Sequence, residues 1–143
     1  MSLKQLTVLV PNEKGALVAI TDLLSDNKIN IRALSIADTA EYGILRMIVD
    51  KNDESISALN SSGYLVKTVD VVGVKIGDDH GKLSQALAVL DRNDINVEYL
   101  YAFMSRTEKH AYVVLRVADI EKSENALKNE GYHLISDSDI EKL

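Results

Sequence analysis

The sequence predicts an α+β protein built from two ferredoxin-like βαββαβ units, each with an antiparallel sheet. The chain repeats itself at a fixed offset of 66 residues, and each copy has the same order of short apolar runs and amphipathic segments. No Gly/Pro/Ser-rich linker separates the copies. We therefore expect domains over residues 1–71 and 72–143, with their sheets side by side as one extended sheet and the helices on one face. The identical positions are Val8/Val74, Gly15/Gly81, Leu17/Leu83, Leu24/Leu90, Asn27/Asn93, Ile29/Ile95, Asn30/Asn96 and Leu34/Leu100.

Apolar spacing and turn residues define the elements of the first copy. After the first strand, helical spacing of apolar side chains that include Leu17 and Leu24 predicts a helix, with Asn27 as its left-handed stop. Asp53 is placed to cap a second short helix, and Gly63 follows the end of that helix. The expected strands cover residues 6–10, 31–37, 43–49 and 64–71.

The second copy repeats this order, and only its hairpin differs. Between Gly81 and Arg116 there are four more residues than between Gly15 and Arg46, and the surplus falls on 105–110. This longer hairpin is either a lid or a solvated loop, because surface insertions cost little. The expected strands cover 72–76, 97–104, 111–117 and 132–136, and the helices cover 82–92 and 121–129.

Composition excludes several classes of function. Among 143 residues, 46% are apolar and 27% are charged, as in an ordinary globular protein, and the formal net charge of −6 disfavours nucleic acids and anionic lipid surfaces. The chain has no cysteine, and its histidines lie at no recognised metal spacing, so we expect no metal site and no cofactor. It shows no cleavage signal and no apolar run long enough to cross a membrane, so we expect a cytoplasmic location.

The loop between the first strand and the first helix of each copy is the candidate binding site. Both loops carry a polar residue, Asn12 or Asp78, three positions before the glycine. A glycine there lets the backbone approach a ligand, and the free N–H groups of the first helical turn can receive a carboxylate. The alternative is that Asn12 and Asp78 are simple helix caps and that the glycines are turn residues.

One predicted strand carries alternating aromatic residues, Tyr99, Tyr101 and Phe103. Such residues can stack on RNA bases, but the strand lacks accompanying basic residues in an acidic chain. The central strands are apolar on both faces, which favours packing of one sheet on another. We therefore expect a homodimer formed through sheet faces or edges, and no binding of nucleic acid or membrane.

In each copy, the strand-to-helix loop and the residues that follow it resemble the ACT domain. The likeness covers nearly the whole chain, twice. It is carried by Leu24, Asn27 and 29–31 in one copy and by their counterparts Leu90, Asn93 and 95–97 in the other. The resemblance implies a regulatory module that binds amino acids between two neighbouring units. ACT domains usually have proline immediately before the loop glycine, where this chain has Lys14 and His80.

The resemblance further implies which residues contact the ligand. The loop of one unit would face the start of the second strand of the other unit, which gives two unequal pockets at the junction of the copies. The first pocket would join the Asn12 loop to Asn96, and the second would join the Asp78 loop to Asn30. The implied ligand-binding residues are Asn12, Glu13, Lys14, Gly15, Ala16, Leu17, Asn30 and Ile31, with Asp78, Asp79, His80, Gly81, Lys82, Leu83, Asn96 and Val97.

No arrangement of a nucleophile and a base emerges from the sequence, so we do not expect an enzyme. The predicted function is a regulatory protein that binds a free amino acid between its two ACT domains and signals to a separate partner, such as a metabolic enzyme or a regulator. The alternative is a protein-interaction or oligomerisation scaffold whose pockets are vestigial.

Overall fold

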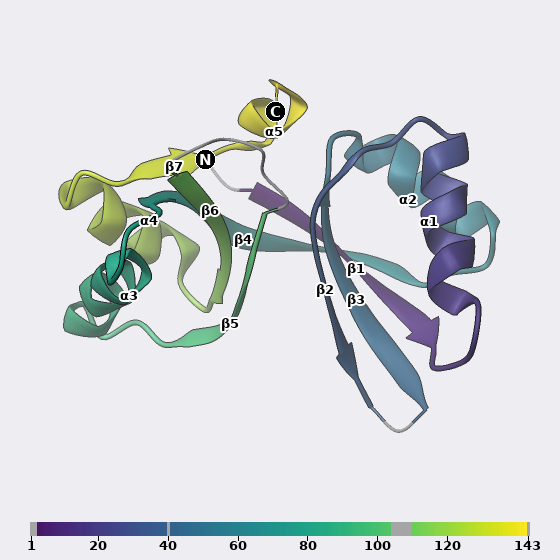
Figure 1. The fold of residues 1–143 in the computed structure, drawn as a ribbon, viewed down its shortest axis with the longest axis horizontal. Coiled ribbons are helices and arrows are strands. Elements are labelled where there is room, and N and C mark those ends of the chain that lie inside the picture. The colour runs from purple at the N-terminus through teal and green to yellow at the C-terminus, as the bar shows by residue number, and fades with distance from the viewer. Residues whose placement is uncertain (1–2, 40, 104–109, 143) are drawn as a thin grey trace. The chain divides into compact units, whose positions relative to one another are not determined.

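The computed structural model describes residues 3–39, 41–103 and 110–142 (Figure 1). Its elements follow the predicted order through two βαββαβ units and add one short helix at the end. In chain order they are β1 Leu3–Pro11, α1 Ala16–Asp26, β2 Ile31–Asp38, β3 Tyr42–Val49, α2 Asn52–Ser61, β4 Val66–Gly77, α3 Lys82–Arg92, β5 Val97–Ala102, β6 His110–Val117, α4 Ile120–Asn129, β7 His133–Ile135 and α5 Asp137–Lys142. The α+β fold class is confirmed.

The chain divides into two compact units, which we call the first and second unit. The first unit holds Lys4–Val69 together with the last residues from Ile140, and the second holds Asp70–Asp139 together with Leu3. The boundary falls inside β4, because the two strands that the sequence predicts over 64–71 and 72–76 are one continuous strand. The side-by-side placement of the two sheets stays a prediction.

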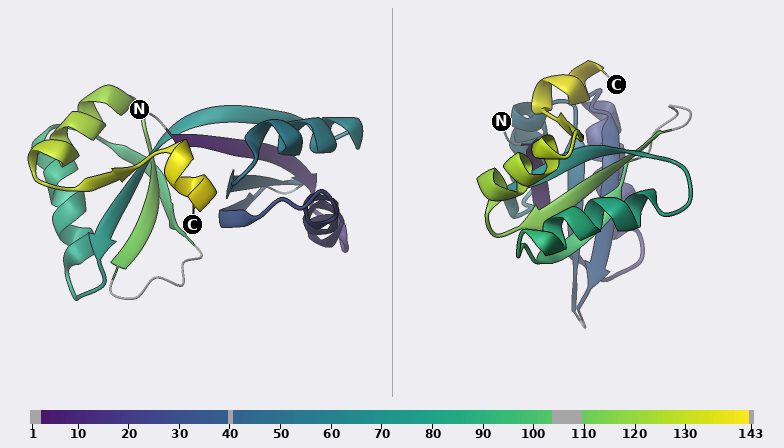
Figure 2. Two further views of the ribbon diagram at one scale, coloured as in Figure 1. Left: turned by 90° about the horizontal axis from the view of Figure 1, so that it is seen from above. Right: turned by 90° about the vertical axis from the view of Figure 1, so that its left-hand side faces the viewer.

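Each unit has the sheet of a ferredoxin-like fold. The strand order is β2-β3-β1-β4 in the first unit and β7-β4-β6-β5 in the second, with antiparallel pairing of β1 with β3, β2 with β3, β4 with β6 and β7, and β5 with β6. The two helices of each unit contact each other and cover one face of its sheet (Figures 1 and 2). Alternate strand residues therefore point to the helices and form the core of that unit.

The two cores are built from equivalent positions. In the first unit, buried side chains from three elements include Val8 of β1, Leu24 of α1 and Leu45 of β3. The second unit packs Val74, Leu90 and Val113 in the same way. The further core residues are Leu6, Val10, Ile20, Ile29, Met47, Val49 and Leu59 in the first unit, and Val72, Ile76, Ala86, Val89, Leu115, Val117, Ala126, Leu127 and Leu134 in the second.

The repeated Leu, Asn and Ile residues form a helix-ending motif. In α1, the N–H of Lys28 donates to the carbonyl of Ser25 at 2.9 Å, and the N–H of Ile29 donates to the carbonyl of Leu24 at 3.0 Å. These are the two hydrogen bonds of a Schellman motif, and Leu24 and Ile29 meet in the core as that motif favours. The left-handed residue is Lys28, with φ of 58°, so the predicted left-handed stop at Asn27 is wrong by one position.

Helices α2, α3 and α4 end with the same pair of backbone hydrogen bonds. Their left-handed residues are Gly63, Asp94 and Gly131. In α2 and α4 the left-handed glycine is followed by Tyr64 or Tyr132, whose N–H donates to the carbonyl of buried Leu59 or Leu127 and whose side chain packs against the core, as this motif favours. The repeat therefore preserves the places where the backbone turns out of each helix.

The structure corrects the predicted cap of α2 and the predicted alignment of the hairpins. The residue before α2 is Lys51, and Asp53 lies inside the first helical turn. Ile31 pairs with Val49, and Val97 pairs with Val117, so β2 corresponds to β5 at an offset of 66 and β3 corresponds to β6 at an offset of 68. The match of Arg46 to Arg116 is therefore displaced by two residues. A displacement of two keeps every side chain on the same sheet face, so apolar patterning did not reveal it.

With the corrected register, the hairpin of the second unit is longer than that of the first by two residues and not by four. Most of this segment, 105–109, and Met104 at the predicted end of the strand lie outside the described residues. His110 begins β6. Of the aromatic residues, the rings of Phe103 and Tyr112 meet edge to face with their centroids 5.9 Å apart.

Candidate functional site

The two strand-to-helix loops are exposed and have the same backbone conformation. Gly15 and Gly81 precede α1 and α3, with φ of 87° and 82° in the left-handed region. A Cβ built on either glycine would meet nothing within 4 Å, so the space above each helix entrance is open. The other exposed loop residues are Asn12, Glu13 and Lys14 in the first unit and Asp78, Asp79 and His80 in the second.

The helix entrances keep free backbone donors. Neither α1 nor α3 has a side-chain cap, so the alternative that Asn12 and Asp78 are simple caps is wrong. The N–H of Ala16 donates to Glu13, and the N–H of Lys82 donates to Asp79, each at 3.3 Å. Within the described residues, the next two N–H groups of each helix, those of residues 17 and 18 and of 83 and 84, have no partner. A carboxylate placed there would meet unpaired donors and the positive end of a helix dipole.

The leucines two positions after the glycines lie outside the cores. Leu17 is 43% exposed and Leu83 is 38% exposed, whereas Leu24 is fully buried. The apolar spacing that predicts α1 groups Leu17 with Leu24, but only Leu24 lies in the core. The first helical residues are half-buried, because Ala16 packs against the core and the aliphatic stem of Lys82 lies over Gly77.

The start of β2 is tied to the end of β3 in the first unit. Asn30 donates its backbone N–H to one oxygen of Asp50 at 2.9 Å and its side-chain amide to the other at 2.8 Å. The ammonium of Lys51 donates to the carbonyl of Lys28 at 3.2 Å and closes the same corner. Ile31, the next residue, packs against the core. The amide of Asn30 is thus occupied by its own chain.

Within one unit, the loop and the strand start lie at opposite ends of the sheet. Pro11 at the end of β1 pairs with Tyr42, whereas Ile31 at the start of β2 pairs with Val49 at the other end of β3. Over the eight residues of β2 the separation is about 26 Å. A single small molecule cannot touch both ends. The predicted pairing of the Asn12 loop with Asn96, and of the Asp78 loop with Asn30, stays a prediction.

The equivalent corner of the second unit is open. Ala118 occupies the position of Asp50, and within the described residues the side chain of Asn96 makes no hydrogen bond. A hollow of about 530 Å³ lies over this corner. Val97 packs against the core, as its counterpart does. The hollow is lined by Asp94, Ile95, Asn96, Glu98, Ala118, Asp119 and Lys122.

Charges around these two corners are inverted between the units. Four equivalent pairs carry opposite charge: Lys28/Asp94, Arg32/Glu98, Lys51/Asp119 and Glu54/Lys122. The hollow of the second unit therefore carries three carboxylates against one ammonium, whereas the first unit places three cations around Asp50 and Glu54. Opposite potentials at equivalent sites favour different ligand groups.

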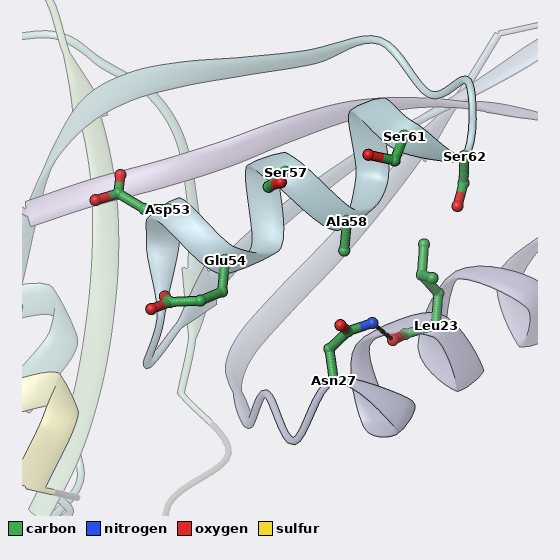
Figure 3. Close-up of a pocket in the computed structure, with 8 residues that line it drawn as sticks. All are labelled: Leu23, Asn27, Asp53, Glu54, Ser57, Ala58, Ser61 and Ser62. Carbon is green, nitrogen blue, oxygen red and sulfur yellow. Dashed lines mark hydrogen bonds between the residues drawn. The ribbon is translucent and has the colours of Figure 1, made fainter.

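A further groove, which the sequence did not suggest, runs between the two helices of each unit. In the first unit it has a volume of about 620 Å³, and its lining residues come from both α1 and α2 (Figure 3). A smaller groove of about 410 Å³ repeats it in the second unit. Asn27 and Asn93 line them, but their amides are bonded to helix carbonyls at 2.8 and 2.7 Å. The lining of the first groove is Leu23, Asn27, Asp53, Glu54, Ser57, Ala58, Ser61 and Ser62.

Other chemistry is sparse in the described part of the chain. No group of three or more His, Asp or Glu residues there could hold a metal ion. Burial raises the pKa of the Glu124 carboxyl on α4, with smaller effects from neighbouring charges. Over the same residues, no helix has the length and apolar character that a membrane crossing requires.

Comparison with known proteins agrees with this fold. A family model described as an ACT domain pair matches residues 1–143. The crystal structure of protein BT0572 from Bacteroides thetaiotaomicron is 34% identical, with a TM-score of 0.93 and coverage of 100% of this chain and 98% of that one. No curated protein matches the chain.

Two more distant structures share the fold. The ligand-free regulatory subunit of aspartate kinase from Thermus thermophilus has a TM-score of 0.68 at 14% identity, covering 90% of this chain and 92% of that one. A structure of aspartokinase alpha and beta subunits has a TM-score of 0.60 at 16% identity, covering 88% and 90%. With the match over the whole chain, two βαββαβ units and two glycine-entered helices, the chain belongs to the ACT domain pair family.

Proposed function

We propose that this protein binds a free amino acid at the helix entrances of its ACT domains and passes that signal to a separate partner. An ACT domain pair is a regulatory module, and the distant structural matches include regulatory subunits of aspartate kinase. The observation that carries the proposal is the pair of uncapped helices that begin at left-handed glycines with open space above them. Such an entrance offers unpaired N–H donors to a carboxylate.

The loops supply the side chains that would read the rest of the ligand. Asn12 offers both a donor and an acceptor, and Asp78 offers an acceptor for an ammonium group. The loop and the strand start of one unit lie at opposite ends of its sheet, so a ligand that touches both kinds of residue must lie between two units. The predicted site residues at the loops and at the strand starts are therefore proposed to act in pairs drawn from different units.

A thermal-melt screen of the full chain against the twenty amino acids tests this function. Selective binding stabilises the folded state, so the melting temperature should rise with one or a few amino acids and keep rising with their concentration. Gly15→Ala and Gly81→Ala, which force a side chain into the left-handed region, should weaken the response of the entrance that they alter. A flat screen across all twenty amino acids would reject the proposal.

The alternative, a protein-interaction scaffold with vestigial pockets, has support from exposed apolar side chains. Leu65 is 70% exposed, and Leu9, which donates its N–H to Leu65, is 42% exposed. We propose that such surfaces mediate a homodimer through sheet faces or edges. Light scattering across a range of concentrations would measure the mass, and a mass of one chain throughout would reject the dimer. The cytoplasmic location stays a prediction.

A further inference from the structure

We infer that the two strand-start corners are not equivalent, and that only the corner of the second unit, at Asn96, receives the ligand, through the ligand's ammonium group. This inference rests on the proposed binding of an amino acid and deepens it. It names the corner that is used, the part of the ligand that binds there and the residue difference that closes the other corner.

The first corner is closed by its own side chains. Both donors that Asn30 could offer at this point, its backbone N–H and its side-chain amide, go to the carboxylate of Asp50. A ligand would have to replace two hydrogen bonds to a charged acceptor, which are among the stronger hydrogen bonds in proteins. Lys51 and Lys28 add a third link across the corner. A ligand ammonium would also meet the positive charges of Lys28, Arg32 and Lys51.

The second corner has the same backbone without this closure. Both units have a register shift at the second residue of the edge strand, between Ile31 and Ala33 and between Val97 and Tyr99. The shared irregularity fixes the correspondence of Asp50 with Ala118. A methyl group cannot accept a hydrogen bond, so the amide of Asn96 stays available beside the hollow. At about 530 Å³, the hollow falls in the range of small-molecule sites.

The charges of the hollow identify the ligand group. Asp119 uses one oxygen to cap α4 through the N–H of Lys122 at 3.0 Å, and Glu98 lies 3.8 Å from Arg116. Within the described residues, the carboxylate of Asp94 makes no hydrogen bond or ion pair. Asp94, aided by the second oxygen of Asp119, is therefore the acceptor for an ammonium group. Lys122 is the one cation that lines the hollow against three carboxylates, so the lining favours an ammonium group, while the ligand carboxylate stays with the helix entrance.

Calorimetry on the full chain tests the inference, with the amino acid that gives the largest melting shift as the probe. Ala118→Asp should supply Asn96 with the acceptor that Asn30 already has and lower the affinity at least tenfold. Asp94→Asn should lower it by a similar factor. Asn60→Asp, which adds the same charge at an exposed position of α2 outside the grooves, is the control and should leave binding intact. Unliganded melting curves check that each variant is folded.

A second probe tests the role of the ammonium group. The 2-hydroxy acid that matches the bound amino acid keeps the carboxylate and loses the ammonium, so it should bind at least tenfold more weakly to the wild-type chain. Equal binding of the two probes would overturn the assignment to Asp94.

The outcomes separate the inference from the proposed function. If an amino acid binds the wild-type chain and binding survives both Ala118→Asp and Asn96→Ala, the proposed function stands and the inference is overturned. Loss of binding with Asn30→Ala, but not with Asn96→Ala, would also overturn it. If no amino acid binds the wild-type chain, the proposed function fails and the inference fails with it.

Discussion

Asn27 and Asn93 make the same hydrogen bond in the two units: each side-chain amide donates to a carbonyl four residues earlier, Leu23 in α1 and Val89 in α3, at 2.8 and 2.7 Å. These carbonyls belong to the last helical turn, where acceptors are short of helical partners, although that of Leu23 also accepts the N–H of Asn27 at 3.3 Å. The asparagines that the repeat preserves therefore secure helix ends.

Replacing either asparagine should lower the free energy of unfolding. Asn27→Ala and Asn93→Ala each remove one partly exposed hydrogen bond, so each should cost about 0.5–1 kcal/mol in urea unfolding. Asn129→Ala is a control, because that exposed asparagine on α4 makes no hydrogen bond of this kind. A loss at Asn129 equal to that at Asn27 would contradict the capping role.

The left-handed residues at the ends of α1 and α3 are not glycine, although glycine occupies this position in α2 and α4. The left-handed conformation costs a residue with a Cβ about 1–2 kcal/mol, and glycine loses part of this gain through its larger entropy when unfolded. Lys28→Gly should therefore raise the free energy of unfolding by up to about 1 kcal/mol. Asp94→Gly should do the same, and Lys28→Ala should not. Chemical denaturation measures the free energy of unfolding of the three variants, and an equal value for Lys28→Gly and Lys28→Ala would contradict the prediction.

Two leucines of α1 should differ sharply in the free energy of unfolding that is lost when each is replaced by alanine. Leu24→Ala empties a fully buried position and should cost about 2–5 kcal/mol, whereas Leu17→Ala should stay within about 1 kcal/mol because Leu17 is 43% exposed. Leu90 and Leu83 repeat this contrast in the second unit. Similar losses at Leu17 and Leu24 in urea unfolding would place Leu17 in the core and contradict the structure.

Glu124 should give stability a dependence on pH. Burial raises the pKa of its carboxyl above 4.5, and Asp70 and Glu121 add to the rise, although Lys128 lowers it. The folded chain then binds this proton more tightly than the unfolded chain, so the free energy of unfolding falls as pH rises from about 4.5 through the folded-state pKa. Glu124→Gln should remove that fall, so its gain in the free energy of unfolding over the wild type should be larger at pH 7 than at pH 4. Glu141→Gln, which removes an exposed carboxylate on α5 that has no part in the shift, controls for the loss of one acidic charge.

Asp50 should matter for stability as well as for closing its corner. Asp50→Ala leaves both donors of Asn30 without a protein acceptor, and water replaces it because Asn30 is exposed, so the loss should be about 1 kcal/mol. Asp50→Asn can still accept one of the two hydrogen bonds and should fall between Asp50→Ala and the wild type. Equal unfolding midpoints for the three proteins would show that these hydrogen bonds contribute nothing.

The order of elements could be predicted because the apolar spacing changes between the periods of strand and helix along both copies. Local backbone choices were harder to predict. Asn27 has the right chemistry for a left-handed stop, yet the chain turns at Lys28, because the side chain of Asn27 instead bonds back to Leu23. Asp53 looks like a cap, but the helix begins one residue earlier, and α5 follows β7 without a strong apolar signal.

The sequence predicts a set of candidate site residues, but it does not show which of their hydrogen-bonding groups are available. Nothing in the sequence indicates that Asn30 is bound by Asp50, because the two lie 20 residues apart and meet only through the pairing of β2 with β3. The register also reveals the replacement of Asp50 by Ala118, since the hairpin alignment from sequence was displaced by two residues.

The way the helices end bears on how the two halves diverged. If one half arose by duplication of the other, the Leu, Asn and Ile residues around the ends of α1 and α3 were kept, while the charges at the strand-start corners reversed, including those of left-handed Lys28 and Asp94. Changes at those corners leave the backbone turns intact, so a duplicated half could alter the ligand groups it attracts without refolding. The chain's history would then be one of a fixed frame with exchangeable surface chemistry, and grafting the corner of one half onto the other is a reasonable design strategy.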